Sequence, residues 1–169
     1  MATKKHAGYP NLAGEHRLGD AGQLVLLFVF LVIWIGDSFA LKKTIFLLEY
    51  VPPFLRIAFA IIIGASGGWL AWAGMKQVFG TQRSRPELIS DGVFRFVRHP
   101  IYLGAILFYL TMIIITGSLA SVAVWIIIIF FYYLISKYEE RILRQQFGES
   151  YDVYRKRVGM LFPKISRKH

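Results

Sequence analysis

The fold is decided by the stretch Asp91-Gly92-Val93-Phe94-Arg95-Phe96-Val97-Arg98-His99-Pro100-Ile101-Tyr102-Leu103-Gly104, in which a basic, aromatic loop runs directly into an apolar helix. A membrane entry point needs only a snorkelling cation and an amphipathic ring. This one carries two arginines, a histidine, a proline and a tyrosine within residues 95–102. They lie at the depth where a polar molecule from the water meets an apolar one from the lipid, and they predict a functional site.

The composition is that of a small integral membrane protein. The chain has 169 residues, of which 56% are hydrophobic and 16% aromatic. A hydrocarbon core of roughly 30 Å needs about 20 apolar residues per helical crossing. We therefore predict an all-α helical bundle, a single domain with spans at 22–41, 54–75, 101–116 and 119–135. The absence of cysteine excludes disulfides, thiolate metal sites and cysteine nucleophiles, and we expect no metal centre.

The predicted spans carry local signals for their ends and contacts. Pro52-Pro53 ends the preceding connection and opens the second span. Small residues from Gly64 to Gly68 predict that another helix packs closely against this span. Gly117-Ser118 predicts a tight turn, so the third and fourth spans form a helical hairpin. Asp37, shortly before Lys42, is expected to be an interfacial residue rather than a functional intramembrane carboxylate.

The net charge of +10 follows membrane topology rather than nucleic-acid binding, because the cations lie beside apolar spans. Of the 20 Lys and Arg residues, 17 fall in the leader 1–20, the loop 76–100 and the segment 137–169. The positive-inside rule places these three segments, and hence both termini and the site, in the cytoplasm.

The segment 137–169 is polar, basic and helical in pattern. Its apolar residues recur every three or four positions and form one stripe: Leu143, Phe147, Tyr151, Tyr154 and Val158. This pattern predicts a C-terminal cytosolic amphipathic helix. Its apolar face can lie on the bilayer or on the loop before the third span.

Two carboxylates complete the predicted site. The hairpin returns the chain to its starting side, so Glu139 and Glu140 should lie close to His99 and Tyr102. A carboxylate so near an apolar run is costly unless it is paired or hydrated. Arg98 is a candidate partner.

Each of these residues also has a structural explanation. Glu140 can form a surface ion pair with Arg144 at i, i+4 spacing. His99 can be an interfacial histidine that orients the loop, with Pro100 in the first helical turn. Tyr102 can belong to the aromatic belt. Spacing alone leaves these alternatives open.

Two motifs stand in order over residues 85–164. The first is Gly92 to Gly104, and the second comprises Glu139-Glu140, Phe147-Gly148-Glu149, Tyr151, Tyr154, Arg157-Val158 and Phe162-Pro163. Together they resemble the isoprenylcysteine carboxyl methyltransferase and phospholipid methyltransferase superfamily. The resemblance implies an integral membrane enzyme that transfers a methyl group from S-adenosylmethionine to a lipophilic acceptor, with S-adenosylhomocysteine as product. It also implies a cofactor pocket at the cytosolic face, closed by the C-terminal segment.

The resemblance assigns residues to this cofactor site position by position. The implied cofactor contacts are Pro86, Glu87, Leu88, Ile89, Phe94, His99, Pro100, Tyr102 and Glu139. The catalytic candidates are His99, Glu140 and Arg98. Relatives that act on the prenylcysteine carboxylate carry an arginine four residues before the glutamate, where this chain has Ile135. That difference argues against a prenylcysteine carboxylate as substrate.

The methyl acceptor stays open at this point, between a carboxyl or thiol group on an isoprenoid-type molecule and a phospholipid amine. A carboxylate or thiolate attacks directly, whereas an ammonium must first lose a proton to a base such as His99 or Glu140. The expected partners are the bilayer and a lipophilic or lipidated acceptor, not nucleic acid, and the oligomeric state is open.

Two alternatives from other classes remain. One is a non-catalytic helical membrane protein that binds anionic lipid or a partner subunit. The other is a transporter-like or heme-associated module, which has less support because His99 gives one axial ligand.

Overall fold

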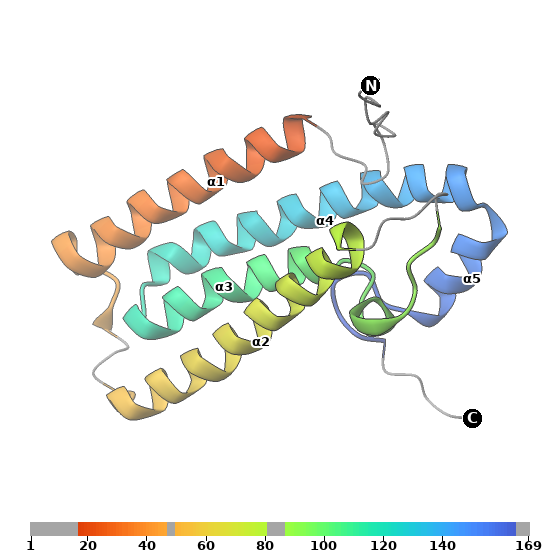
Figure 1. Cartoon of the computed structure of the whole chain (residues 1–169). Helices are drawn as coiled ribbons and strands as arrows, with labels where there is room; N and C mark the ends of the chain where they lie inside the picture. The colour runs from red at the N-terminus through yellow and green to blue at the C-terminus, as the bar shows by residue number, and fades with distance from the viewer. Residues whose placement is uncertain (1–16, 47–49, 81–86, 165–169) are drawn as a thin grey trace, which may run out of the picture.

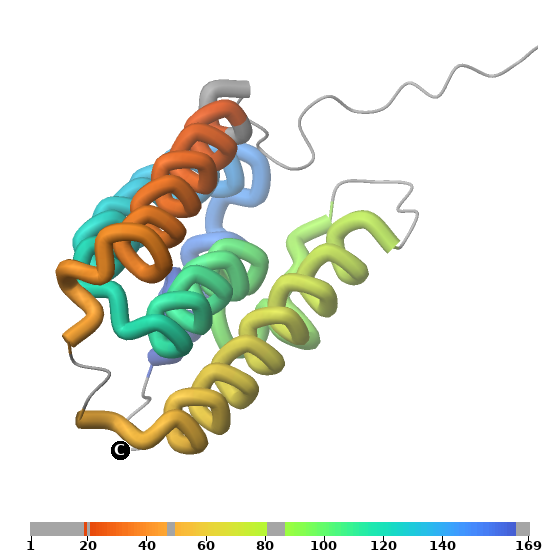
Figure 2. Tube along the Cα trace, turned by 90° about the vertical axis from the view of Figure 1, so that its left-hand side faces the viewer, coloured from red at the N-terminus to blue at the C-terminus, as the bar shows by residue number. Residues whose placement is uncertain are grey.

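The computed structural model describes residues 17–46, 50–80 and 87–164. Its long helices are α1 (Arg17–Ile35), α2 (Pro53–Phe79), α3 (Pro100–Thr116) and α4 (Leu119–Phe147). They lie in a row in the order α1, α4, α3, α2 (Figures 1 and 2). The shorter elements are η1 (Gly36–Leu41), η3 (Gly92–Arg95) and α5 (Glu149–Arg157). The described residues are thus all-helical apart from one isolated bridge, which confirms the predicted class.

Among the described residues, three regions are long and apolar enough to cross a membrane: Ala21–Leu41, α2 and α4. The remaining apolar helix, α3, has 17 residues, which corresponds to about 25 Å of helix. It lies between α2 and α4 (Figure 1). A helical membrane protein follows from these lengths, and α3 is the shortest of its apolar helices.

Helix ends follow the local signals. Pro53 and Pro100 each open a helix, where the missing amide hydrogen costs nothing. Gly117 ends α3 with a φ of 65°, a left-handed conformation that favours glycine. Ser118 then caps α4 by accepting a hydrogen bond from the Ser121 amide at 3.2 Å. The tight turn at Gly117-Ser118 therefore has the predicted form.

Glycines bring α2 and α3 together. A Cβ added to Gly104 would lie 2.6 Å from the Gly67 carbonyl oxygen, and one added to Gly67 would lie 2.9 Å from Leu107 Cβ. Gly64 faces Thr111 in the same way, whereas Gly68 has no neighbour within 4 Å of such a Cβ. The small residues of the second span do pack against another helix, through Gly64 and Gly67 but not Gly68.

Asp37 stabilises the end of the bundle that contains the Gly117-Ser118 turn, which we call the turn end. Its carboxylate accepts hydrogen bonds from the Thr44 hydroxyl at 2.5 Å and the Ser118 hydroxyl at 2.6 Å. Asp37 is buried by these protein contacts, and its predicted interfacial position stays a prediction. It joins the end of α1 to the α3–α4 turn, and that network explains why a carboxylate is tolerated there.

The C-terminal part differs from the prediction. α4 continues without interruption through Lys137 to Phe147, because no helix breaker separates the apolar run from the polar residues. Gly148, with a φ of 54°, then turns the chain into the short α5. The predicted stripe is therefore split between two helices, and Tyr151, Tyr154 and Val158 form a small buried cluster. Leu88, from the loop before α3, packs on that cluster, so the stripe faces the loop.

Candidate functional site

The loop before α3 is held by the end of α2. The Val93 amide donates to the Gln77 side-chain oxygen at 3.2 Å, and Val93 itself is buried. Gly92 has a φ of 53°, and a Cβ there would collide with Gln77. Local sequence thus explains why η3 turns beneath α2 and delivers Arg98 and the residues after it to the first turn of α3.

The C-terminal segment lies beside the same loop. The Arg98 and His99 amides donate to the Gly159 and Met160 carbonyls at 2.9 and 3.1 Å. The Tyr154 hydroxyl donates to the Phe94 carbonyl at 2.7 Å. The loop, α5 and the end of α4 meet at one end of the bundle, which we call the loop end (Figure 1).

His99 joins α3 to α4 at the loop end. Its Nδ1 lies 3.3 Å from Glu139 Oε2, and its ring stacks on Tyr102 with 5.7 Å between centroids. The Tyr102 hydroxyl donates to the other Glu139 oxygen. Burial alone would lower the pKa of His99, but the Glu139 and Glu140 carboxylates outweigh it and raise the pKa above its ordinary value. The imidazole therefore holds a proton more tightly than a free histidine.

Arg98 and Glu140 form a buried ion pair. Arg98 Nε donates to Glu140 Oε1 at 2.7 Å, Nη2 pairs with the same oxygen, and both side chains are only 7% exposed. Arg98 Nη1 also donates to the Arg155 carbonyl at 3.1 Å and to the Val158 carbonyl. Arg98 therefore joins α4 to the C-terminal segment through charge-assisted hydrogen bonds.

The alternative pairing of Glu140 with its helix neighbour is not formed. Arg144 instead binds Asp152 of α5, with Nη2 to Oδ2 at 3.0 Å, on the exposed surface. Glu139 and Glu140 consequently have different surroundings. The first, 19% exposed, meets His99 and Tyr102, and the second is enclosed with Arg98.

Three enclosed polar atoms surround this pair without a hydrogen-bond partner among the described residues: His99 Nε2, Ser136 Oγ and Tyr151 Oη. His99 Nε2 lies 3.6 Å from Glu140 Oε1, too far for a hydrogen bond. Burial raises the pKa of Tyr151, so its hydroxyl stays neutral. Unpaired buried groups are uncommon in folded proteins, and a functional role is one explanation for them.

The remaining predicted site residues lie around the cluster. Pro100 is buried at the start of α3, and Phe94 is half-buried. Leu88 is part of the small core under α5, Ile89 is half-buried and Glu87 is exposed. Pro86 lies outside the described residues. The structure thus brings together five of the predicted residues: His99, Tyr102, Glu139, Arg98 and Glu140. Residues 87–89 lie in the loop before α3, with Leu88 against the cluster of Tyr151, Tyr154 and Val158.

Sequence reasoning missed Ser136. It lies one helical turn before Glu140, on the same buried face of α4. A lone serine inside a run of apolar residues was the signal for it, since such a hydroxyl needs a partner in a membrane protein.

These features define a class of protein: a helical membrane protein with a cluster of buried ionisable residues at the loop end of the bundle. A family model described as phospholipid methyltransferase matches residues 55–150, more than half of the chain. The chain belongs to this phospholipid methyltransferase family.

Individual relatives carry two kinds of name. Methanethiol S-methyltransferase 1 of Bradyrhizobium diazoefficiens is 39% identical over 85 residues, which cover 50% of this chain and 29% of that protein. Protein-S-isoprenylcysteine O-methyltransferase of Schizosaccharomyces pombe is 27% identical over 146 residues, covering 77% and 61%. Methanethiol S-methyltransferase of Pseudomonas deceptionensis is 33% identical over 120 residues, covering 59% and 44%. The chain thus spans between about a third and three fifths of the length of these relatives.

Proposed function

We propose that this protein is a membrane methyltransferase that uses S-adenosylmethionine and acts on a lipophilic acceptor, with a thiol as the favoured nucleophile. The observation that carries the proposal is the meeting of Glu139 with His99 and Tyr102 in a chain of the phospholipid methyltransferase family. The proposal includes four spans in one domain, which rest on the helix lengths. It also places both termini and the site on the cytoplasmic side, because the cations are concentrated in those segments.

The residues present fit the cofactor. S-adenosylmethionine has a cationic sulfonium, an ammonium, a carboxylate and an adenine ring, so its site needs an anion, hydrogen-bonding groups and aromatic surface. Glu139 is partly exposed and can bind a cation, Tyr102 and Phe94 supply rings, and His99 Nε2 is an enclosed polar atom without a partner. The described loop residues 87–89 lie before α3, and we assign them to the edge of the cofactor site. When bound, the cofactor supplies an activated methyl group.

His99 is the residue best placed to move a proton. Glu139 orients the ring through Nδ1, which leaves Nε2 without a hydrogen-bond partner. A base held by a carboxylate in this way, with a raised pKa, can accept a proton from a thiol or an ammonium. Glu140 is engaged by Arg98, so we assign that ion pair to holding the C-terminal segment over the site rather than to proton transfer.

The charges of the site favour a thiol over a carboxylate. An anionic acceptor group needs a cation to bind it, yet Arg98 already holds Glu140, and Ile135, half-buried one turn before Glu139, supplies no charge. A thiol needs only a base, and His99 provides one. Two of the relatives described above are methanethiol S-methyltransferases. A phospholipid amine is the second candidate, because Glu139 is an anion that an ammonium could approach.

Cofactor binding tests the proposal and separates it from a non-catalytic lipid- or subunit-binding role. S-adenosylhomocysteine titrated into the detergent-solubilised chain should bind saturably by calorimetry. Glu139→Gln and His99→Asn should weaken binding about tenfold or more, the equivalent of losing about 1.4 kcal/mol or more. Glu149→Gln, which removes an exposed carboxylate at the start of α5, should leave it unchanged. Absence of binding by the folded chain at millimolar cofactor would refute the proposal.

The acceptor is identified by where the label goes. The chain is incubated with methyl-labelled cofactor and each of three probes: 1-octanethiol, N-acetyl-S-farnesylcysteine and phosphatidylethanolamine. Label in a base-stable thioether supports the thiol, label in a base-labile ester supports the carboxylate, and label in the lipid supports the amine.

A further inference from the structure

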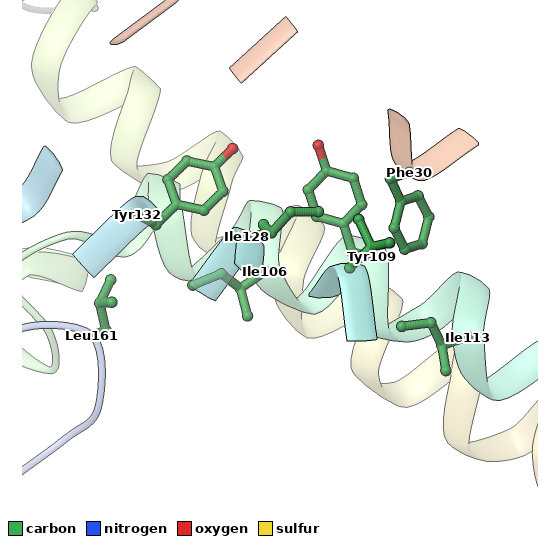
Figure 3. Packing of buried hydrophobic residues seen from close by; sticks show 8 residues of the cluster. Phe30, Ile106, Tyr109, Ile113, Ile128, Tyr132 and Leu161 are labelled. Atoms are coloured by element: carbon green, nitrogen blue, oxygen red, sulfur yellow. The ribbon is translucent and has the colours of Figure 1, made fainter. Parts of the chain in front are cut away.

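Two tyrosines inside the bundle have buried rings and unpaired hydroxyls. Tyr109 of α3 and Tyr132 of α4 are 5% and 4% exposed and belong to the same buried cluster. No hydrogen bond joins either phenol to a residue that the structure describes. Figure 3 shows both hydroxyls pointing in one direction, away from Ile106 and Leu161. They face the side on which Phe30 of α1 lies.

The two threonine hydroxyls of α3 have partners. Thr111 and Thr116 donate to the carbonyls of Leu107 and Met112, four residues earlier, at 2.9 and 3.2 Å. A serine inside a helix has the same option, but Ser136 Oγ is enclosed and forms no such bond. Ser136 therefore adds a third unpaired hydroxyl, one turn beyond Tyr132 on the same face of α4.

Leaving a hydroxyl unpaired in an apolar interior is unfavourable, and of the three only Ser136 Oγ is fully enclosed. Phenylalanine would fill the same space at positions 109 and 132 without a polar atom to satisfy, and alanine would do so at position 136. In a segment surrounded by lipid, water does not reach such groups easily. A ligand that accepts hydrogen bonds from them accounts for all three.

These hydroxyls lead to the site at the loop end. The Tyr132 ring lies 5.1 Å from the Tyr102 ring between centroids, and Tyr102 bonds Glu139. Ser136 lies one turn before Glu140. Tyr109 lies two turns along α3 from Tyr102, deeper in the bundle. The three groups therefore follow a path from the hydrocarbon region towards His99.

We propose that Tyr109, Tyr132 and Ser136 bind the acceptor, and that they select a lipophilic molecule whose head group carries lone pairs, a thiol, over one with an ammonium head. This inference rests on the proposed methyltransferase function. Phenols and serine hydroxyls donate hydrogen bonds to sulfur or oxygen. Residues 100–136 contain no Asp or Glu to neutralise an ammonium and no Lys or Arg to neutralise a carboxylate. A neutral thiol on an apolar chain suits this interior best.

Removing the hydroxyls tests the inference, with stability and binding expected to change in opposite directions. Tyr109→Phe and Tyr132→Phe should keep or raise the thermal midpoint of the ligand-free chain, because each removes an unpaired polar atom. Each should weaken binding of 1-octanethiol, measured by calorimetry in detergent, about tenfold, with S-adenosylhomocysteine binding unchanged. Tyr133→Phe, a neighbouring and exposed tyrosine on α4, is the control and should change neither property.

The outcomes separate this inference from the proposed function. Phe variants with a lowered thermal midpoint and unchanged octanethiol affinity would show that the phenols are structural, and would overturn the inference. An equal loss of affinity for octylamine and octanethiol would also overturn it, since no selection by lone pairs would remain. If the wild-type chain fails to bind S-adenosylhomocysteine, the methyltransferase proposal fails, yet octanethiol binding by the same variants still tests these residues.

Discussion

Replacing Arg98 should be among the most destabilising single changes at the loop end. Arg98→Met removes the ion pair with Glu140 and the hydrogen bonds to the Arg155 and Val158 carbonyls, in a site where both charged side chains are 7% exposed. Breaking a buried pair leaves an uncompensated charge and costs about 3–5 kcal/mol. Glu140→Gln should cost about 3 kcal/mol, because the guanidinium keeps its carbonyl partners.

A double-mutant cycle measures the pair itself. The free energy of unfolding is obtained in mixed micelles from the change in tryptophan fluorescence with increasing denaturing detergent. The double variant should lose less than the sum of the single losses, by about 1–3 kcal/mol. Arg144→Gln, which removes an exposed partner of Asp152, is the control and should cost at most about 1 kcal/mol. Strict additivity, or single losses below about 1 kcal/mol, would refute the view that Arg98 fastens the C-terminal segment to α4.

Three further predictions follow from other contacts. Gly104→Ala should destabilise the chain by about 1–3 kcal/mol, because the new Cβ would meet the carbonyl of α2, whereas Gly68→Ala, in open space, should be neutral or stabilising in the same unfolding assay. His99 has a raised pKa, so its protonated form stabilises the fold fully below about pH 6.5, and this contribution is lost as the pH rises through the folded-state pKa. Thermal melts between pH 6 and 9 should show that decline, and His99→Asn should flatten it. Tyr154→Phe should cost about 1 kcal/mol through loss of the bond to the Phe94 carbonyl, as measured by unfolding.

Much of the architecture was predictable because a membrane helix can be recognised in the sequence by the length of its apolar run and by the residues at its ends. Pro53, Pro100 and Gly117 each mark a helix end in the structure as the sequence indicated. The hairpin then required Glu139 to return to His99, and the structure places them 3.3 Å apart. Connections of this kind depend on local chemistry, which a sequence displays directly.

Other features depended on choices between equivalent partners. Spacing could not decide whether Glu140 binds Arg98 or Arg144, because both lie within reach of a helix-borne carboxylate. Nor could periodicity show that the apolar stripe divides at Gly148. A helix can continue through a glycine or end at it, and the pattern is the same in both cases. The burial of Asp37 depends on Thr44 and Ser118, and Ser118 is far along the chain. These partners are defined only by tertiary contacts.

Because α4 is one continuous helix, its length sets the distance between the Gly117-Ser118 turn and the carboxylates of the site. About 20 residues separate Leu119 from Glu139, which at 1.5 Å per residue is about 30 Å, the thickness of a bilayer's hydrocarbon core. A hydrocarbon core that begins at the Gly117 turn would therefore end at the level of these carboxylates. One residue inserted into α4 before Glu139 would shift Glu139 by about 1.5 Å along the helix axis and rotate it by about 100°, away from His99.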